Sequence, residues 1–108
     1  MKKQTINENN KIGKYQYVFR LYVTGASPNS LRAIANSKSI FEKYLSENYE
    51  LEIIDVHQQS LIAKEDNIVA LPLLIKKYPL PEKRLIGDMS DMEKVLRSIG
   101  ISNEVVIK

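Results

Sequence analysis

YVFRLYV at residues 17–23, followed by TGASPNS at residues 24–30, decides how the chain begins to fold. The first run is aromatic and β-branched with a single charge, which is typical of a central strand buried on both faces. In the second run, Ser27 is placed to cap a helix and Pro28 suits the first helical position. We therefore predict a strand over residues 17–23 and a helix over residues 28–46.

A second strand is predicted over residues 50–56, which read ELEIIDV. Charged and apolar residues alternate there before an apolar pair and an aspartate, a pattern that favours a strand of about seven residues. Strand, helix and strand then form one βαβ unit. Because such units are right-handed in nearly all proteins, the two strands should lie parallel, with the helix packed across them.

A short helix and a hairpin are predicted next along the chain. Residues 60–66 are polar with two apolar anchors, which favours a short helix. Pro72 precedes a strand that begins at residue 73, where a proline is tolerated because no ladder donor is needed. PLP at residues 79–81 separates that strand from residues 84–86, a spacing that favours an antiparallel hairpin.

The last helix is predicted to begin at a capping box formed by Ser90 and Glu93. Apolar residues continue from there at helical spacing: Met92, Val95, Leu96 and Ile99. Residues 104–107, which read EVVI, fit either a strand fragment or a loose segment.

Length and charge indicate one domain with a basic tail. The 108 residues are 44% hydrophobic, which suffices for one core but leaves no room for two domains of ordinary size. Residues 1–14 are polar without apolar periodicity, so we expect them to be disordered and residues 15–108 to form the domain. The tail carries the whole formal net charge of +3. The balanced domain therefore argues against nucleic acid as a partner.

A membrane partner is not expected either. No apolar run approaches the roughly 20 residues that a bilayer span needs. The chain starts with the polar residues MKKQT instead of a hydrophobic signal segment. We therefore expect a cytoplasmic location.

The side chains that most enzymes use are missing or isolated in this sequence. Without cysteine, the chain can form no disulfide, thiolate metal site or thiol nucleophile. The single histidine, His57, has no neighbours at metal-ligand spacing. Since no acid, base and nucleophile converge, we predict no enzyme, no cofactor and no metal site.

The predicted order of elements, βαβαββα, is that of the thioredoxin-like α/β fold, with a mixed four-stranded sheet and helices on both faces. Proteins of this fold commonly have a cis proline before the third strand, and Pro72 stands in that place. When the inner proline of the active thioredoxin motif is aligned with Pro28, Ala26 and Asn29 stand at the two positions that carry the thiols. A redox role is therefore not expected, and we expect Pro72 to shape the turn into the strand.

Four stretches closely resemble the KaiB family of circadian clock proteins. They are LYVTGASPNSLRA at 21–33, LEIIDV at 51–56, KEDNIVALPLLIK at 64–76 and PEKRLIGDMSDMEKVL at 81–96. The resemblance covers roughly residues 15–100. The combination of G-x-x-P-N-S, a central I-D-V and I-G-D-x-S is far more specific than any one of these motifs.

This resemblance implies a protein that binds partners and catalyses nothing. KaiB proteins dock on the ATPase KaiC and help to time its phosphorylation cycle, and they sequester KaiA where it exists. The expected partners are thus a KaiC-like ATPase, a KaiA-like protein or a sensor histidine kinase, and further copies of the chain in a dimer or tetramer. The family is also metamorphic, with an alternative βαββααβ form.

Two residues near the end of the last helix differ from the family pattern and bear on this switch. Clock members have a glycine where this sequence has Ser98, and an acidic residue is usual where it has Gly100. Serine is a better helix former than glycine by roughly 0.5 kcal/mol. We therefore predict that the thioredoxin-like form dominates and that conversion of residues 90–107 to strand is disfavoured.

The second departure concerns the surface through which the family docks. Clock members have a small residue and a lysine where this chain has Glu50 and Glu52, whereas Arg32 keeps the family's basic character. We predict Arg32, Glu50 and Glu52 as partner-binding residues. The charge reversal either weakens docking to a standard KaiC or matches a change in the partner.

Two other interpretations stay open at this point. The glutamates could simply keep an exposed strand soluble, with Asp55 capping the turn that follows. The chain could also be a thioredoxin-like adaptor in stress responses that acts without a KaiC-like partner.

Overall fold

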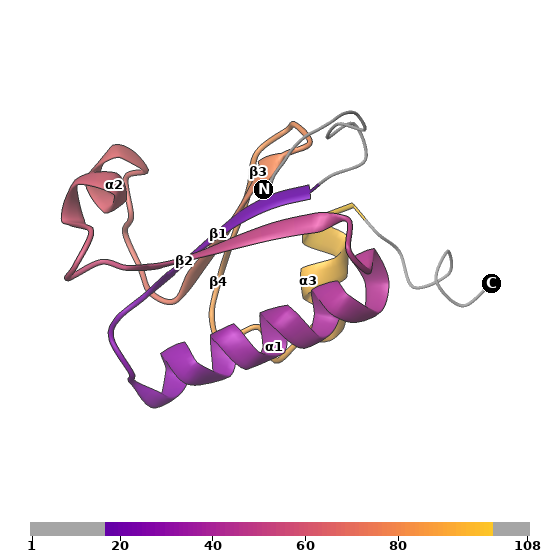
Figure 1. Cartoon of the computed structure of the whole chain (residues 1–108), viewed down its shortest axis with the longest axis horizontal. Coiled ribbons are helices and arrows are strands. Elements are labelled where there is room, and N and C mark those ends of the chain that lie inside the picture. Colours follow the sequence, from indigo (N-terminus) through magenta and orange to yellow (C-terminus); the bar gives the residue numbers. More distant parts are fainter. Residues whose placement is uncertain (1–16, 101–108) are drawn as a thin grey trace.

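The computed structural model describes residues 17–100, and the chain folds there into four strands and three helices (Figure 1). In chain order they are β1 (Tyr17–Val23), α1 (Pro28–Leu45), β2 (Tyr49–Asp55), α2 (Ser60–Glu65), β3 (Leu73–Tyr78), β4 (Lys83–Ile86) and α3 (Met92–Ser98). The predicted order βαβαββα is confirmed. The proposed tail at 1–14, the domain start at residue 15 and the segment 104–107 lie outside the described residues.

The four strands form one mixed sheet in the order β2-β1-β3-β4. β1 pairs in parallel with β2 along its whole length and antiparallel with β3, which pairs antiparallel with β4. The parallel βαβ unit and the antiparallel hairpin that the sequence predicts are both confirmed. β1 and β3 are therefore central, and β2 and β4 are the edges.

Helices cover both faces of the sheet because side chains of β1 alternate between two cores. Phe19, Leu21 and Val23 pack with α1 and α3, and Tyr22 packs with α2. Figure 1 shows α1 and α3 together on one side of the sheet and α2 apart from them. The larger core lies under α1, where the rings of Phe19 and Phe41 stack with centroids 4.0 Å apart.

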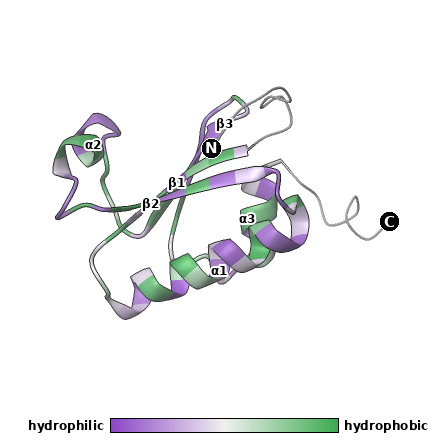
Figure 2. Ribbon diagram, viewed as in Figure 1, coloured by the Kyte–Doolittle hydropathy of each residue, from purple (hydrophilic) through white to green (hydrophobic). Residues whose placement is uncertain are grey.

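The start of α1 follows the sequence prediction. The Ser27 hydroxyl accepts a hydrogen bond from the backbone N–H of Ser30 at 3.2 Å, and Pro28 occupies the first helical position. Apolar and polar residues alternate along α1 in Figure 2, as expected of a helix with one buried side. The helix ends at Leu45, one residue before the predicted end.

One buried polar atom of α1 gives a first prediction. Among the described residues, the Ser37 hydroxyl is the buried side-chain group that has no hydrogen-bond partner. Ser37→Ala removes this desolvated hydroxyl and adds helix propensity, so it should raise the free energy of unfolding by about 1 kcal/mol. Urea denaturation followed by circular dichroism measures this change.

The control for Ser37→Ala is Ser39→Ala, at an exposed position of the same helix. That variant should gain only the helix-propensity part, about 0.5 kcal/mol. A loss of stability in Ser37→Ala would show that the hydroxyl has a hydrogen-bond partner after all, such as a water.

The capping box predicted for α3 is wrong by one residue. The cap is Asp91, whose Oδ1 accepts a hydrogen bond from the Lys94 N–H at 3.2 Å, and the helix begins at Met92. Ser90 cannot cap the helix because it belongs to the preceding turn, where its N–H donates to Asp88 Oδ1 at 3.1 Å. Asp91 therefore caps the helix in place of Ser90, because the preceding turn holds Ser90.

The end of α3 involves both residues that differ from the family pattern. Ser98 is the last helical residue, and its hydroxyl donates to the Lys94 carbonyl oxygen at 2.8 Å. Gly100 has a positive φ of 89°, a conformation that glycine adopts without strain, and its N–H donates to the Arg97 carbonyl oxygen. Ser98 therefore belongs to the helix and Gly100 follows its end.

Replacing Ser98 tests the contribution of this helix end. Ser98→Gly should lower the free energy of unfolding by about 0.5 kcal/mol, because glycine loses more backbone entropy in a helix. Chemical denaturation at pH 7 measures the loss. Ser98→Ala, which keeps helix propensity without the hydroxyl, should lose less, and equal stability of the glycine variant and wild type would contradict the argument.

Pro72 is buried at the entry of β3, and the Leu71–Pro72 peptide bond is cis. Its carbonyl oxygen accepts a hydrogen bond from the Gly87 N–H at 3.0 Å. The residue thereby ties the start of β3 to the end of β4.

Candidate functional site

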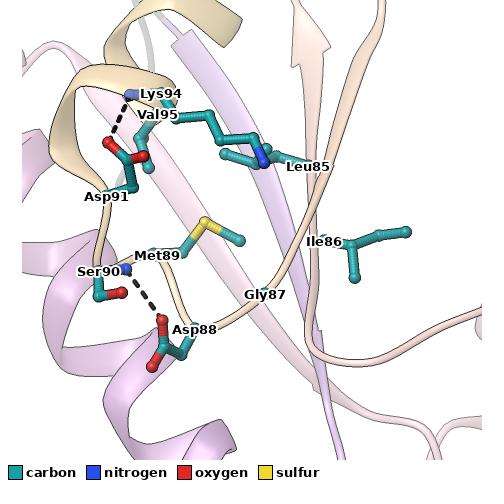
Figure 3. A pocket seen from close by; sticks show the side chains of 9 residues that line it. All are labelled: Leu85, Ile86, Gly87, Asp88, Met89, Ser90, Asp91, Lys94 and Val95. Atoms are coloured by element: carbon teal, nitrogen blue, oxygen red, sulfur yellow. Dashed lines mark hydrogen bonds between the residues drawn. The ribbon is translucent and has the colours of Figure 1, made fainter.

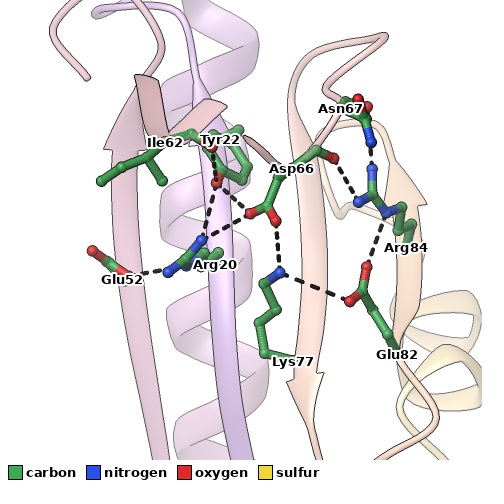
Figure 4. A network of polar contacts seen from close by, with 9 residues as sticks. All are labelled: Arg20, Tyr22, Glu52, Ile62, Asp66, Asn67, Lys77, Glu82 and Arg84. Carbon is green, nitrogen blue, oxygen red and sulfur yellow. Dashed lines mark hydrogen bonds and ion pairs between the residues drawn. The ribbon is translucent and has the colours of Figure 1, made fainter. Parts of the chain in front are cut away.

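The candidate site lies on the sheet face that α2 covers only in part. α2 has six residues and packs over one end of this face, against Tyr22, Ile54, Leu73 and Ile75. The rest of the face carries charged side chains, which we call the charged sheet face. Its members are Arg20, Glu50, Glu52, Lys77, Glu82 and Arg84, and Figure 4 shows all of them except Glu50.

Asp66, directly after α2, is the centre of this surface. Only 7% of the residue is exposed, and its carboxylate accepts hydrogen bonds from three side chains. The Arg20 guanidinium lies at 2.9 Å, the Lys77 amine lies at 2.6 Å, and the Tyr22 hydroxyl is the third donor. The carboxylate thus joins the end of α2 to both central strands.

Hydrogen bonding controls the ionisation of this group. Burial alone would raise the pKa of Asp66, but the hydrogen bonds from Lys77, Tyr22 and Arg20 outweigh it and lower the pKa to about 2. Burial and the hydrogen bond to Asp66 raise the pKa of Tyr22 to about 12. Across the physiological pH range the network therefore keeps a charged carboxylate and a neutral phenol.

β3 and β4 extend the network to the other edge of the sheet. A register shift leaves Lys77 without a partner on β1, and its amine reaches Asp66 and Glu82. Arg84 donates to the Asp66 carbonyl oxygen at 2.6 Å and pairs with Glu82 at 3.2 Å. Asp66, the residue that follows α2, is consequently bound to side chains of the three strands β1, β3 and β4.

Glu50 and Glu52 lie together on the exposed edge strand β2, one strand pleat apart on the same face. Glu52 pairs with Arg20 at 3.3 Å, across the register pair that joins them. Glu50 has no ion pair within residues 17–100. The two carboxylates therefore differ, since Glu52 is partly neutralised and Glu50 is exposed without an ion pair in that part of the chain.

Arg32 lies apart from the two glutamates, on the helix that covers the opposite face. Its side chain is 55% exposed and pairs with Asp88 at 3.1 Å, and it also donates to the Asn29 side chain. Asn36 donates to the Asp88 carbonyl oxygen at 2.9 Å. Arg32 thus links α1 to the turn before α3, and the structure does not gather the three predicted binding residues into one patch.

A cavity of about 200 Å³ lies beside that turn, between β4 and α3 (Figure 3). Its lining is Leu85, Ile86, Gly87, Asp88, Met89, Ser90, Asp91, Lys94 and Val95. The carboxylates of Asp88 and Asp91 already accept the N–H groups of Ser90 and Lys94. These contacts shape the turn and the helix start.

The turn after β2 involves two residues that the sequence analysis considered, Asp55 and His57. Asp55 caps the turn after β2, because its two oxygens accept the N–H groups of His57 and Gly25 at 2.9 and 3.1 Å. His57 itself is exposed. Within residues 17–100 no cluster of three or more His, Asp or Glu side chains could hold a metal ion. The same residues include no helix that is long and apolar enough to cross a membrane.

Sequence reasoning missed Asp66 and Lys77. Arg20 gave a signal, since it is the single charge in an otherwise apolar central strand and such a charge needs a buried partner. The partner follows 46 residues later, so no local pattern could identify it.

The sequence of this chain is similar to those of known proteins. The family model described as the KaiB domain matches residues 20–101. Two curated relatives are both named circadian clock oscillator protein KaiB. That of Synechococcus elongatus is 49% identical over 80 residues, covering 74% of this chain and 78% of the relative. That of Microcystis aeruginosa is 43% identical over 93 residues, covering 86% and 89%.

Solved structures with the same fold include proteins of low sequence identity. The N-terminal domain of Synechococcus elongatus SasA matches with a TM-score of 0.66 at 18% identity, over 86% of this chain and 91% of that domain. The thioredoxin Deadhead of Drosophila melanogaster matches with a TM-score of 0.65 at 13% identity, over 82% and 83%. These likenesses establish the thioredoxin-like fold. The family match and the curated relatives show that this chain belongs to the KaiB family of circadian clock proteins.

Proposed function

We propose that this chain is a non-catalytic regulatory protein of the cytoplasm that binds a KaiC-like ATPase. Binding modulates the phosphorylation and ATPase cycle of that partner, in circadian timing or environmental adaptation. The observation that carries the proposal is the KaiB-domain match over residues 20–101, supported by clock-protein relatives at 43% to 49% identity. A KaiA-like protein, a sensor histidine kinase and further copies of the chain are additional candidate partners.

The charged sheet face supports a role in binding. Its ion pairs and hydrogen bonds fix the side chains of Arg20, Lys77 and Arg84, so the surface is ordered before a partner arrives. Glu50 and Glu52 add two exposed carboxylates at the β2 edge. A basic docking surface on the partner would complement them.

The state of the acidic groups supports the absence of catalysis. The carboxylate of Asp66 is surrounded by three donors and has its pKa lowered to about 2, so it is a poor general base at neutral pH. The positions that carry thiols in an active thioredoxin are Ala26 and Asn29. The chemistry of the proposed function therefore belongs to the partner.

Binding to the KaiC-like ATPase from the same source tests this function. The purified protein is titrated against the ATPase hexamer in the presence of ATP, at several protein concentrations, by a mass-based method. Saturable binding, with a changed rate of ATP hydrolysis or phosphorylation, is expected. If no complex forms where the ATPase is hexameric, the clock-type mechanism fails.

The second candidate is a thioredoxin-like adaptor that works without a KaiC-like ATPase, in stress responses. The observation that favours it is the pair of carboxylates at the β2 edge, where clock members have a small residue and a lysine. Failure of the binding experiment above would favour this candidate.

A further inference from the structure

Lys76 on β3 is a lysine in an unusual place. Only 6% of the residue is exposed, and it points to the same face as Leu74, toward the core under α1. Its register partner on β1 is Phe19, an aromatic core residue, and its register partner on β4 is Lys83. The side chain of this buried residue is thus placed between an apolar ring and a second positive charge.

No acidic group of residues 17–100 compensates this arrangement. Within residues 17–100 neither an ion pair nor a hydrogen bond holds the Lys76 amine. The Ser37 hydroxyl is the one fully buried and unpartnered side-chain N or O atom in that part of the chain, so the Lys76 amine is not enclosed there in the same way. An amine that has no partner in residues 17–100 and belongs to a residue still 6% exposed is therefore one that a small reagent can approach.

The surroundings favour the neutral, nucleophilic form of this amine. Burial lowers the pKa of Lys76, and the positive charge of Lys83 lowers it further. An amine that is desolvated and adjacent to another cation is the arrangement by which lysine becomes a nucleophile.

The neighbouring Lys77 provides an internal comparison. It follows Lys76 directly in the chain but faces the other side of the sheet, where Asp66 and Glu82 bind its amine. Two adjacent lysines thus have opposite environments, since carboxylates of residues 17–100 bind Lys77 and none of them binds Lys76.

We propose that Lys76 is a modification site that reacts with small acyl phosphates in preference to the other lysines of the described chain. The Lys76 nitrogen attacks the carbonyl carbon of the acyl phosphate and forms a C–N bond as the C–O bond to phosphate breaks. Phosphate leaves with the electron pair of that bond, and the proton of the amine passes to water. The product is a neutral amide, so modification also removes the repulsion between residues 76 and 83.

The experiment exposes the folded full-length chain to acetyl phosphate at neutral pH and measures the initial acetylation rate at each lysine. Chymotryptic peptides with fragmentation mass spectrometry separate Lys76 from Lys77, which trypsin would not. Lys76 should react faster than Lys77 and faster than the exposed lysines at 38, 43 and 64. The preference should vanish in protein unfolded with urea.

Variants at position 83 test the positioning role of the second charge. Lys83→Gln should slow acetylation of Lys76 by about threefold, since the neighbouring positive charge is lost, while Lys83→Arg should keep the wild-type rate. Lys83 is exposed on an edge strand, so both variants should fold. A Lys76 rate at or below that of the exposed lysines, or equal Lys76 rates in Lys83→Gln and Lys83→Arg, would overturn the proposal. Neither result depends on the binding of an ATPase.

Discussion

Asp66→Asn should lower the free energy of unfolding by about 3 kcal/mol at pH 7. The substitution keeps the size of the side chain but removes the negative charge that faces Arg20 and Lys77. Both cations then lie beside a neutral amide, and the Tyr22 hydroxyl loses its strongest acceptor. Urea denaturation monitored by circular dichroism measures the loss.

Glu65→Gln is the matched control for this variant. It removes the preceding carboxylate of the chain, which is exposed, and should change stability by less than about 0.5 kcal/mol. If Asp66→Asn were as stable as this control, the hydrogen bonds and ion pairs of Asp66 would contribute nothing measurable to the free energy of unfolding.

The same variant should alter the acid stability of the protein. Because the pKa of Asp66 is lowered from 3.8 to about 2 on folding, the charged carboxylate stabilises the folded state above pH 4. This contribution, about 2 kcal/mol, is lost as pH falls through the folded value. The wild type should therefore lose more stability than Asp66→Asn between pH 4 and pH 2.

Glu50→Lys should weaken binding to the KaiC-like ATPase of the same source by about tenfold at low salt. The carboxylate of Glu50 is exposed and has no ion pair within residues 17–100, so its reversal acts directly on the partner. Glu52→Lys should also weaken binding, and it additionally removes the pair with Arg20. The dissociation constant is measured at several salt concentrations.

Salt and a distant variant serve as controls for the interface. The effect of Glu50→Lys should shrink as ionic strength rises, because exposed charges are screened over about 10 Å at 0.1 M salt. Glu93→Lys makes the same charge change on α3, which packs on the opposite face of the sheet, and should leave affinity unchanged. Equal affinities for Glu50→Lys and wild type would place the interface elsewhere on the molecule.

The elements of this fold could be predicted because each has its own local signal. The apolar run at 17–23, the Ser27 cap with Pro28, and the hairpin around PLP at 79–81 all depend on neighbours in the sequence. The parallel pairing of β1 and β2 followed from the handedness of the βαβ unit. Exposure of Glu50 and Glu52 likewise followed from the alternation along a strand.

The contacts that order the site could not be predicted in this way. Arg20 meets Asp66 because α2 folds back over the sheet, and Arg32 meets Asp88 because the turn before α3 lies against α1. Each pair depends on the final packing of distant segments. The α3 cap moved from Ser90 to Asp91 for the same reason, since Asp88 holds Ser90 within that turn.

The position of β2 at the sheet edge has a consequence for self-association. One side of this strand offers backbone N–H and C=O groups that a β2 strand of a second molecule could join. In a symmetric antiparallel pair, however, Glu50 and Glu52 would meet the same carboxylates of the other molecule. Like charges placed opposite each other destabilise a strand pair. No strand of residues 17–100 covers this edge, and the two glutamates therefore disfavour direct pairing of β2 with the β2 strand of an identical molecule.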